Sequence, residues 1–353
     1  MAFDSCGAHD IKVALVNNYI PFVYGGAEFL VDALKGELLA RGHQVTLTRI
    51  PFPIALDHRV INNILSCRCL SVDEADKVVA FKFPAYFVPH SNKTIWMFHQ
   101  LRQVYELWNG EYGLPATPEN AGLREVVINS DNLFLREAKR IFVNSKEVSA
   151  RLRRYNGIGS EVLYPPLTDQ DKFRCDTYGD YLFYPSRITS FKRQHLAIES
   201  MQYTRSKVRL VLAGRADEPD YENRLKRLIA AKGLEEKVTM LGWIDQQQKF
   251  DLMANALCCV YLPYQEDSYG FVSMEAFYSH KCVISLEDSG GTRELLEDGV
   301  NGYVVPPNPH ALAQKFDALY GNRGLARRLG EQGYVELASR DISWDVVIDR
   351  LLQ

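Results

Sequence analysis

The sequence has few of the features that would place it in a specialised class of protein. Its seven cysteines among 353 residues show neither the paired spacing of a disulfide framework nor the pattern of a zinc site. No apolar run reaches the roughly 18 residues that cross a bilayer. Nothing ahead of Ile11 resembles a signal peptide. We therefore expect reduced thiols in a cytoplasmic protein, which is at most peripheral to the inner face of a membrane.

A large excess of charge of one sign is also absent. The 41 Lys and Arg residues nearly balance the 44 Asp and Glu residues, which leaves a formal net charge of −3. This balance produces no overall field that would attract nucleic acid, so we expect no nucleic-acid partner. A chain of 353 residues exceeds one typical hydrophobic core. We therefore expect two domains.

The first half alternates strand-like and helix-like segments. A strand at 11–16, a helix at 27–40 and a strand at 44–49 make a βαβ unit. Such a unit predicts a right-handed crossover and a parallel sheet. Further strands are predicted at 77–81, 94–98, 140–144 and 161–164. Pro165-Pro166 ends this series, and the polar segment 167–179 is predicted to be an interdomain linker.

A second alternating series follows that linker. Strands are predicted at 181–184, 208–213, 238–241, 257–261, 282–285 and 302–304, and helices at 195–202, 221–232, 246–254, 271–279, 292–297 and 310–320. The fold class is therefore α/β, with two Rossmann-like domains that face each other across a central cleft. Ligands of open parallel sheets bind at the carboxyl ends of the strands, so the loops after strands should carry the chemistry.

The most informative segment is 265–276, which reads as an acidic turn, a glycine and the start of a helix. An apolar strand precedes it, and Gly270 separates the turn from helical spacing. The first N–H groups of a helix lack internal partners and carry partial positive charge, which suits a phosphate. Asp267 lies in the turn and Glu275 about one helical turn inside. Carboxylates beside an anion site serve hydroxyl groups, so the segment predicts a sugar nucleotide as ligand.

Two competing motifs can be discounted. The loop from Asn17 to Ala27 contains Gly25-Gly26 but lacks the Gly-x-Gly-x-x-Gly spacing of a nicotinamide-binding site. Asp169-Gln170-Asp171 has the Asp-x-Asp spacing of metal-dependent transferases but lies in the predicted linker. We therefore expect no metal site.

The acidic motif and several other blocks resemble glycosyltransferase family 4, a family of retaining enzymes with the GT-B fold. Asp267 and Glu275 fill the two acidic positions of the family, with Tyr269-Gly270 between them. The first position is Asp where the family usually has Glu, and Glu266 stands beside it. The other blocks are Pro21 to Glu28, Tyr184 to Arg187 with Lys192, Leu212 to Arg215, Leu241 to Ile244, Asp288 to Glu294, Asp298 to Gly302 and Ser343-Trp344.

The resemblance implies a role for each domain. Residues 1–166 would be the acceptor-binding domain, onto which a helix at 343–353 crosses back. Residues 167–342 would bind the nucleotide-sugar donor.

The resemblance also implies roles for individual residues. Arg187 and Lys192 would hold the donor diphosphate, and fixed cations there would stabilise the leaving group. The remaining diphosphate contacts would be the loop with Gly25 and Gly26 and the amides of Phe271 and Val272, and Gly214 and Gly270 would be further donor-binding positions.

The sugar, ribose and base contacts follow in the same way. Glu275 would bind the ribose hydroxyls, Ile244 the base, and Asp267 with His99 the sugar. Four of the residues named above have a simpler interpretation. Lys192 could be a solvated charge, and Glu275 could interact only with its own helix dipole. Asp267 could be a capping residue, and His99 could be hydrogen-bonded only locally.

A basic run lies in the first half: Lys139, Arg140, Lys146, Arg151, Arg153 and Arg154. Many acceptors in the family are lipid-linked, so this run could touch a membrane surface, although a charged helix face is usually only solvated.

The sequence therefore predicts a retaining, metal-independent hexosyltransferase. The donor would be a nucleotide-diphosphate sugar, with UDP favoured, and the acceptor a glycan or lipid-linked hydroxyl in surface polysaccharide or glycoconjugate synthesis. A nucleotide-sugar epimerase of the same fold and a non-catalytic sugar-nucleotide-binding protein remain alternatives.

Overall fold

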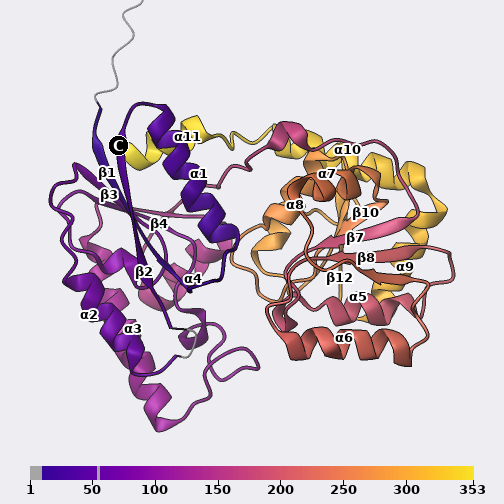
Figure 1. The fold of residues 1–353 in the computed structure, drawn as a ribbon, viewed down its shortest axis with the longest axis horizontal. Coiled ribbons are helices and arrows are strands. Elements are labelled where there is room, and N and C mark those ends of the chain that lie inside the picture. Colours follow the sequence, from indigo (N-terminus) through magenta and orange to yellow (C-terminus); the bar gives the residue numbers. More distant parts are fainter. Residues whose placement is uncertain (1–9, 54–55) are drawn as a thin grey trace, which may run out of the picture. The chain divides into compact units, whose positions relative to one another are not determined.

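The computed structural model describes residues 10–53 and 56–353. The chain divides into two compact units, each built around one six-stranded sheet (Figure 1). Unit 1 comprises Met1–Pro166 and Ile342–Gln353, and unit 2 comprises Leu167–Asp341.

The sheet of unit 1 has the strand order β2-β1-β3-β4-β5-β6, and every neighbouring pair is parallel. Its strands are β1 (Lys12–Tyr19), β2 (Gln44–Pro51), β3 (Lys77–Ala80), β4 (Lys93–Met97), β5 (Arg140–Val143) and β6 (Glu161–Val162). Its helices are α1 (Gly26–Ala40), α2 (Arg59–Arg68), α3 (Pro118–Phe134), α4 (Lys146–Asn156) and α11 (Trp344–Leu352). Helix α1 packs on β1, β2 and α11, whereas α2, α3 and α4 contribute to a second core on the sheet.

The sheet of unit 2 has the order β12-β11-β10-β7-β8-β9 and is also parallel throughout. Its strands are β7 (Tyr181–Pro185), β8 (Arg209–Ala213), β9 (Val238–Met240), β10 (Cys258–Val260), β11 (Val283–Leu286) and β12 (Gly302–Val305). Its helices are α5 (Gln194–Met201), α6 (Pro219–Ala231), α7 (Gln246–Asn255), α8 (Phe271–Tyr278), α9 (Pro309–Gly321) and α10 (Arg323–Ala338).

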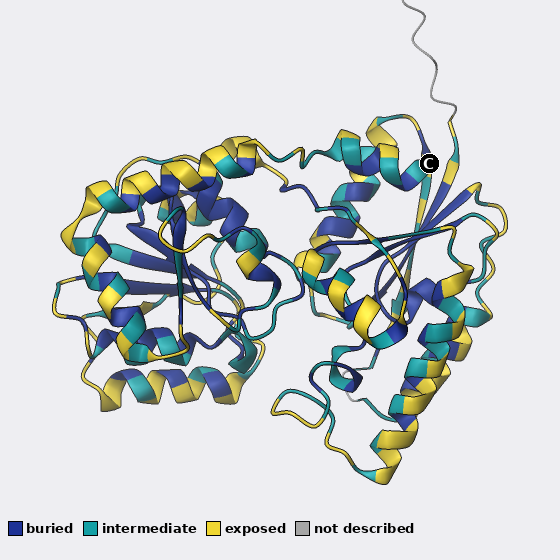
Figure 2. Cartoon of the chain, turned by 180° about the vertical axis from the view of Figure 1, so that it is seen from behind, coloured by how far each residue is buried: buried dark blue, intermediate teal, exposed yellow. Residues whose placement is uncertain are grey.

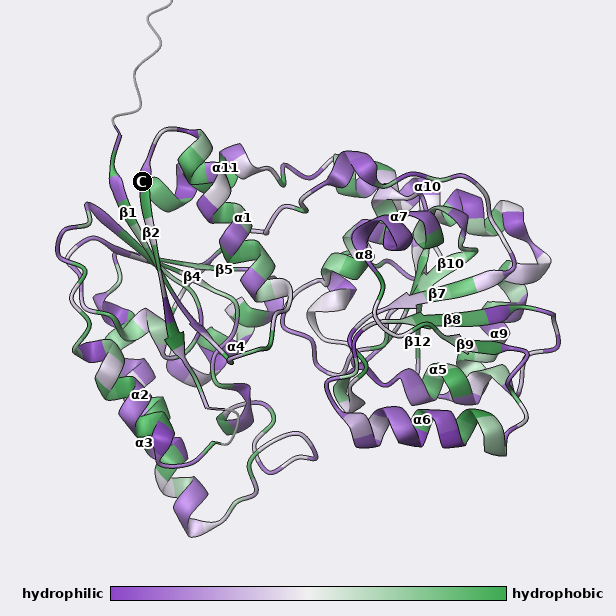
Figure 3. Cartoon of the chain, in the orientation of Figure 1, coloured by the Kyte–Doolittle hydropathy of each residue, from purple (hydrophilic) through white to green (hydrophobic). Residues whose placement is uncertain are grey.

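Burial follows the layering in each unit. The strands are mostly buried and the outer helix faces exposed (Figure 2), because parallel strands covered by helices must be apolar on both faces. The strands of unit 2 are correspondingly hydrophobic, while the outer helix α6 alternates hydrophilic and hydrophobic residues (Figure 3). Among the described residues, no helix combines the length and apolar composition that a bilayer crossing requires.

The α/β fold class is confirmed, and the predicted strands lie within three residues of the observed ones. The predicted helix at 292–297 is wrong, because only one 3-10 turn forms, at Gly291–Glu294. The side-chain nitrogen of Asn301 donates to the Leu295 carbonyl at 2.9 Å, and the side-chain oxygen of Asn301 accepts from the Glu297 N–H at 2.9 Å. These bonds occupy backbone groups that a helix would need.

The segment predicted to be a linker, 167–179, is packed against unit 2. Phe173 is buried, and its ring lies edge-on to Phe250 at 4.7 Å between centroids. The N–H groups of Asp176 and Thr177 donate to the Ala254 carbonyl at 3.0 and 3.3 Å. The aromatic and backbone contacts override the polar composition that suggested a free linker.

Candidate active site

Most of the residues predicted to bind the donor belong to unit 2 and lie at one edge of it. Because its strands are all parallel, their carboxyl ends share that edge. Arg187 and Lys192 follow β7, Gly214 follows β8 and Ile244 follows β9. Gly270 caps helix α8, which leads away from β10.

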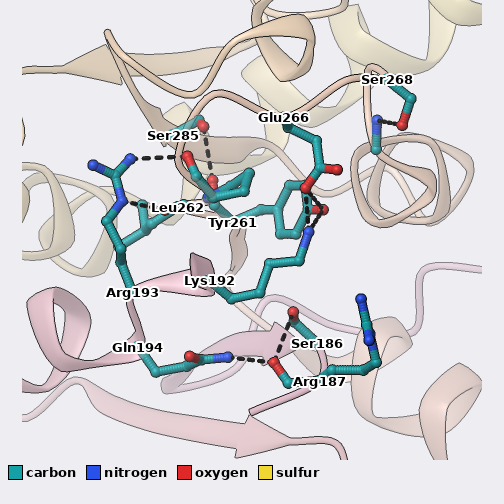
Figure 4. Close-up of polar contacts among 12 residues, drawn as sticks. Ser186, Arg187, Lys192, Arg193, Gln194, Tyr261, Leu262, Glu266, Ser268 and Ser285 are labelled. Carbon is teal, nitrogen blue, oxygen red and sulfur yellow. Dashed lines mark hydrogen bonds and ion pairs between the residues drawn. The ribbon is translucent and has the colours of Figure 1, made fainter. Parts of the chain in front are cut away.

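Lys192 lies between a carboxylate and a phenol (Figure 4). Its ammonium group forms an ion pair with Glu266 and donates to the Tyr261 hydroxyl at 2.8 Å. That hydroxyl donates to Glu266 at 3.0 Å. Burial first, then the Glu266 charge, raises the pKa of Tyr261, which keeps the phenol protonated as a donor. Glu266 therefore holds Lys192 in place, and the contact of Asp267 with the sugar stays a prediction.

Arg193 connects three loops at the same edge, a role that the sequence did not suggest. It is buried, and its guanidinium meets both carboxylate oxygens of Asp288 at 2.7 Å. It also donates to the carbonyls of Leu262 and Pro263 at 2.9 and 2.8 Å (Figure 4). A bidentate guanidinium fixes geometry more closely than an ammonium group could. Arg193 thus joins the ends of β7, β10 and β11.

Helix α8 begins at the edge as the sequence predicts. Gly270 has φ 77°, and a Cβ there would lie 2.5 Å from the Tyr261 ring, so only glycine fits. Phe271 and Val272 are the first two helical residues, whose N–H groups precede the internal hydrogen bonds of the helix.

The second acid of the motif is buried and paired. Glu275 lies in α8 and forms an ion pair with Lys249 of helix α7, with 2.6 Å between the Lys249 nitrogen and the Glu275 oxygen. Lys249 also lies over the Phe173 ring at 5.8 Å. The ion pair fixes the position of the Glu275 carboxylate within the edge. Lys249 was missed because a lysine on a predicted helix carries no signal of a partner 26 residues away.

Arg187 and Gly214 have distinct local contacts. The half-exposed Arg187 pairs with Asp217 at 2.7 Å. A Cβ on Gly214 would lie 1.9 Å from the Ser186 carbonyl. This close approach explains the glycine by backbone packing, independently of any ligand.

Ile244 lines a cavity of about 490 Å³ beside α7. Its neighbours include the exposed Leu241 and Trp243, and Gln248 of α7. The side-chain oxygen of Gln248 accepts from the Asp245 N–H in a capping box. The side-chain NH₂ group of Gln248 is a hydrogen-bond donor on this lining residue of the cavity.

Unit 1 holds the remaining predicted residues. Gly25 precedes α1, and its N–H donates to Glu28 at 3.0 Å. Glu28 is buried and pairs with Lys82 at 2.6 Å. Gly26 is the first residue of α1. His99 follows β4, and its Nδ1 lies 2.7 Å from the Gln100 carbonyl. Since a carbonyl only accepts, Nδ1 is the donor in this bond.

The basic run of unit 1 is only partly a surface feature. Arg151 is buried and pairs with Glu106 and Glu147, both at 2.9 Å. Arg140 pairs with Glu161 at 3.0 Å. Arg153 and Arg154 are exposed. The prediction that Arg151 belongs to an exposed patch is therefore wrong, because its helix turns it toward two carboxylates.

A buried acid of unit 1 was also missed. Asp131 of α3 accepts from Tyr86 at 2.8 Å and Tyr105 at 2.6 Å. Burial raises the pKa of Asp131 to about 7, against hydrogen bonds from the tyrosines and Gln100. The sequence gives no sign of it, because one Asp in an amphipathic helix reads as surface.

Within residues 10–53 and 56–353, no group of three or more His, Cys, Asp or Glu side chains is arranged to hold a metal ion.

The chain resembles known proteins in both sequence and fold. Residues 168–336, nearly all of unit 2, match the family model "Glycosyl transferases group 1". The chain is 30% identical to the mouse alpha-1,3/1,6-mannosyltransferase ALG2 over 42% of its length and 36% of that protein. It is 27% identical to the human protein of that name over 55% and 52%. The alignments thus span about a third to a half of these relatives. The E. coli O-antigen chain mannosyltransferase C is 23% identical over 89% of both chains.

Solved structures resemble the whole fold. Anabaena Alr3699/HepE, solved in complex with UDP and glucose, has a TM-score of 0.71 and 19% identity over 97% of this chain and 98% of its own. The sucrose-phosphate synthase of Thermosynechococcus elongatus has a TM-score of 0.76 and 18% identity over 97% of both chains. The architecture is therefore that of the GT-B glycosyltransferases. Unit 2 belongs to the group 1 glycosyltransferases, and the resemblance drawn from the motifs is confirmed.

Proposed function

We propose that the chain is a retaining glycosyltransferase, which moves a hexosyl group from a nucleotide-diphosphate sugar to a hydroxyl of a glycan or lipid-linked acceptor. UDP is the proposed carrier, and surface polysaccharide or glycoconjugate synthesis the proposed context. The observation that carries the proposal is the joining of Lys192, Glu266 and Tyr261 within the edge that also holds the start of α8.

The diphosphate would lie between Arg187, Lys192 and the first amides of α8. As the glycosidic bond breaks, negative charge grows on the departing diphosphate, and fixed cations stabilise it. Lys192 is already held by Glu266 and Tyr261, so little reorganisation is needed when the charge develops. The acceptor hydroxyl would attack from the face that the diphosphate leaves, and the departing phosphate would take its proton. No covalent enzyme nucleophile and no metal enter this scheme.

The nucleoside would lie beside α7 and α8. Glu275, held by its pair with Lys249, would accept from two ribose hydroxyls, and Ile244 would contact the base. Asp267 would bind a sugar hydroxyl. Gly25, Gly26 and His99 belong to unit 1, and their contacts with the donor stay predictions.

The test is release of nucleoside diphosphate from a panel of donors, followed by chromatography. The panel includes UDP-glucose and GDP-mannose, because named relatives are mannosyltransferases. Turnover of the preferred donor should fall at least about tenfold in Arg187→Ala and in Lys192→Ala, which is more than 1.4 kcal/mol of transition-state stabilisation.

Arg227→Ala, which alters an exposed arginine on α6, is the matched control and should leave turnover unchanged. The chelator EDTA should also leave it unchanged, and loss of turnover in EDTA would replace the proposal with a metal-dependent mechanism. Wild-type turnover in both site variants would remove diphosphate stabilisation from the account. An inverted anomer in the product, measured by NMR, would contradict retention.

A further inference from the structure

A cluster of nucleophilic side chains lies at the end of unit 2 opposite the candidate active site. Cys175 and Tyr178 precede β7, Cys258 is the first residue of β10, and Lys281 and Cys282 precede β11. These are the amino-terminal ends of the strands, whereas the donor residues follow the carboxyl ends. The proposed transfer reaction uses none of the five side chains.

Cys175 and Lys281 are in direct contact within this cluster. The Lys281 nitrogen lies 3.1 Å from the Cys175 sulfur and also donates to the Thr177 carbonyl. The same nitrogen lies 4.1 Å from the centre of the Tyr178 ring. The contact joins residues 106 positions apart, so the fold brings the amine and the thiol together.

The two groups differ in exposure in a way that suits sequential chemistry. Lys281 is fully buried, and this burial lowers the pKa of its amine. Cys175 is only partly buried, so a small oxidant can reach it. The partly exposed sulfur can therefore react first and the shielded amine second.

We propose that Cys175 is a site of oxidative modification whose product is a covalent sulfur–nitrogen bond to Lys281, formed in the presence of a hydroperoxide. In the first step Cys175 gives up its thiol proton and the sulfur attacks a hydroperoxide oxygen. The O–O bond breaks, the sulfur is oxidised to a sulfenic acid, and the departing oxygen takes that proton and leaves as water or an alcohol.

In the second step the neutral Lys281 amine attacks that sulfur. The S–N bond forms, the S–O bond breaks, and the hydroxyl leaves as water with a proton from the amine. Burial lowers the pKa of the Lys281 amine, which favours the neutral form that this step needs.

A disulfide is disfavoured by the state of the other cysteines. Cys258 and Cys282 are fully buried, and burial raises the pKa of the Cys258 thiol well above its usual value. Buried thiols of this kind are inert. Lys281 is the nucleophile already in contact with Cys175.

The experiment treats the full chain with a modest excess of hydrogen peroxide, without reductant, and maps the product by tryptic mass spectrometry. The expected product is a peptide pair joined between Cys175 and Lys281, lighter by two hydrogen atoms than the sum of its parts and reversed by dithiothreitol. Trypsin should fail to cleave after Lys281 in it. The link closes a long loop, so the midpoint of thermal unfolding should rise by about 5 °C.

Two variants separate the product from its alternatives. Lys281→Arg keeps the cation but removes the nucleophile, so the joined pair should disappear and Cys175 should carry oxygen instead. Cys282→Ser should leave the joined pair intact. Cys69→Ser, at an exposed cysteine of unit 1, is the matched control and should behave as wild type.

A disulfide from Cys175 to another cysteine, a link that retains an oxygen atom, or an unmodified Cys175 under these conditions would each overturn the proposal. Survival of the joined mass in Lys281→Arg would do so too.

Discussion

Neighbouring residues of the same charge have separate tasks in the candidate site. Lys192 is held beside a carboxylate and a phenol at the strand edge, whereas Arg193 turns inward to join three loops. Arg193 has φ 53°, in the left-handed region, and lies between the 3-10 turn that ends at Lys192 and the start of helix α5. In sequence the pair looks like any basic dipeptide. The structure shows what the sequence does not: Lys192, proposed to bind diphosphate, and Arg193, which joins the loops, have different partners.

The buried Asp131 predicts a pH dependence of stability. Its pKa in the folded chain is about 7, against an ordinary value of 3.8, so the folded state favours the protonated carboxyl. The stabilisation by Asp131 is fully present below the pKa that its carboxyl has in the unfolded chain, and it is lost as the pH rises through about 7. The free energy of unfolding of wild type, minus that of Asp131→Asn, should therefore fall between about pH 4 and pH 7, as measured by urea unfolding.

Asp341→Asn, at an exposed aspartate, is the control and should give a difference that does not fall in that window. A difference for Asp131→Asn that rises with pH would mean that the buried carboxyl is ionised in the folded chain.

At the scale of whole elements, helix α10 shows why some elements escape prediction. It contains Gly330 and Gly333, which in sequence suggest a break. In the structure these glycines let α10 approach closely, since added Cβ atoms would lie 1.9 Å from the His280 carbonyl and 2.3 Å from the Phe277 ring. Helix α3 was missed for another reason, because its buried face includes only Leu123, Val127 and Asp131. The strands were easier, because continuous apolar runs between turns are typical of buried parallel strands.

The same substitution in two helices should therefore have opposite effects. Gly330→Ala should lower the free energy of unfolding by about 1–3 kcal/mol, because the new methyl group has no space. Gly36→Ala lies inside α1, where an added Cβ meets nothing within 4 Å, and should raise it by about 0.5–1 kcal/mol. Urea unfolding of both variants measures the two changes. Destabilisation by Gly36→Ala, or a neutral Gly330→Ala, would contradict this packing.

For the molecule as a whole, the fold could be predicted further than the site. Alternating strands and helices predicted two parallel α/β sheets, and the motif at 265–276 predicted a helix start beside acidic residues. The pairs Lys192–Glu266, Lys249–Glu275 and Arg193–Asp288 could not be predicted, because each joins side chains from loops or helices that only the tertiary fold brings together. These three ion pairs determine where the charged side chains of the candidate site are held.

The most direct test of the central claim is calorimetric titration of the full chain with UDP and UMP, each with and without EDTA. If the edge of unit 2 binds a diphosphate through Arg187, Lys192 and the start of α8, UDP should bind at least about tenfold more tightly than UMP, independently of EDTA. Lys192→Ala should remove most of that preference. Equal affinity for UDP and UMP, or a diphosphate preference that survives Lys192→Ala and Arg187→Ala together, would contradict the account.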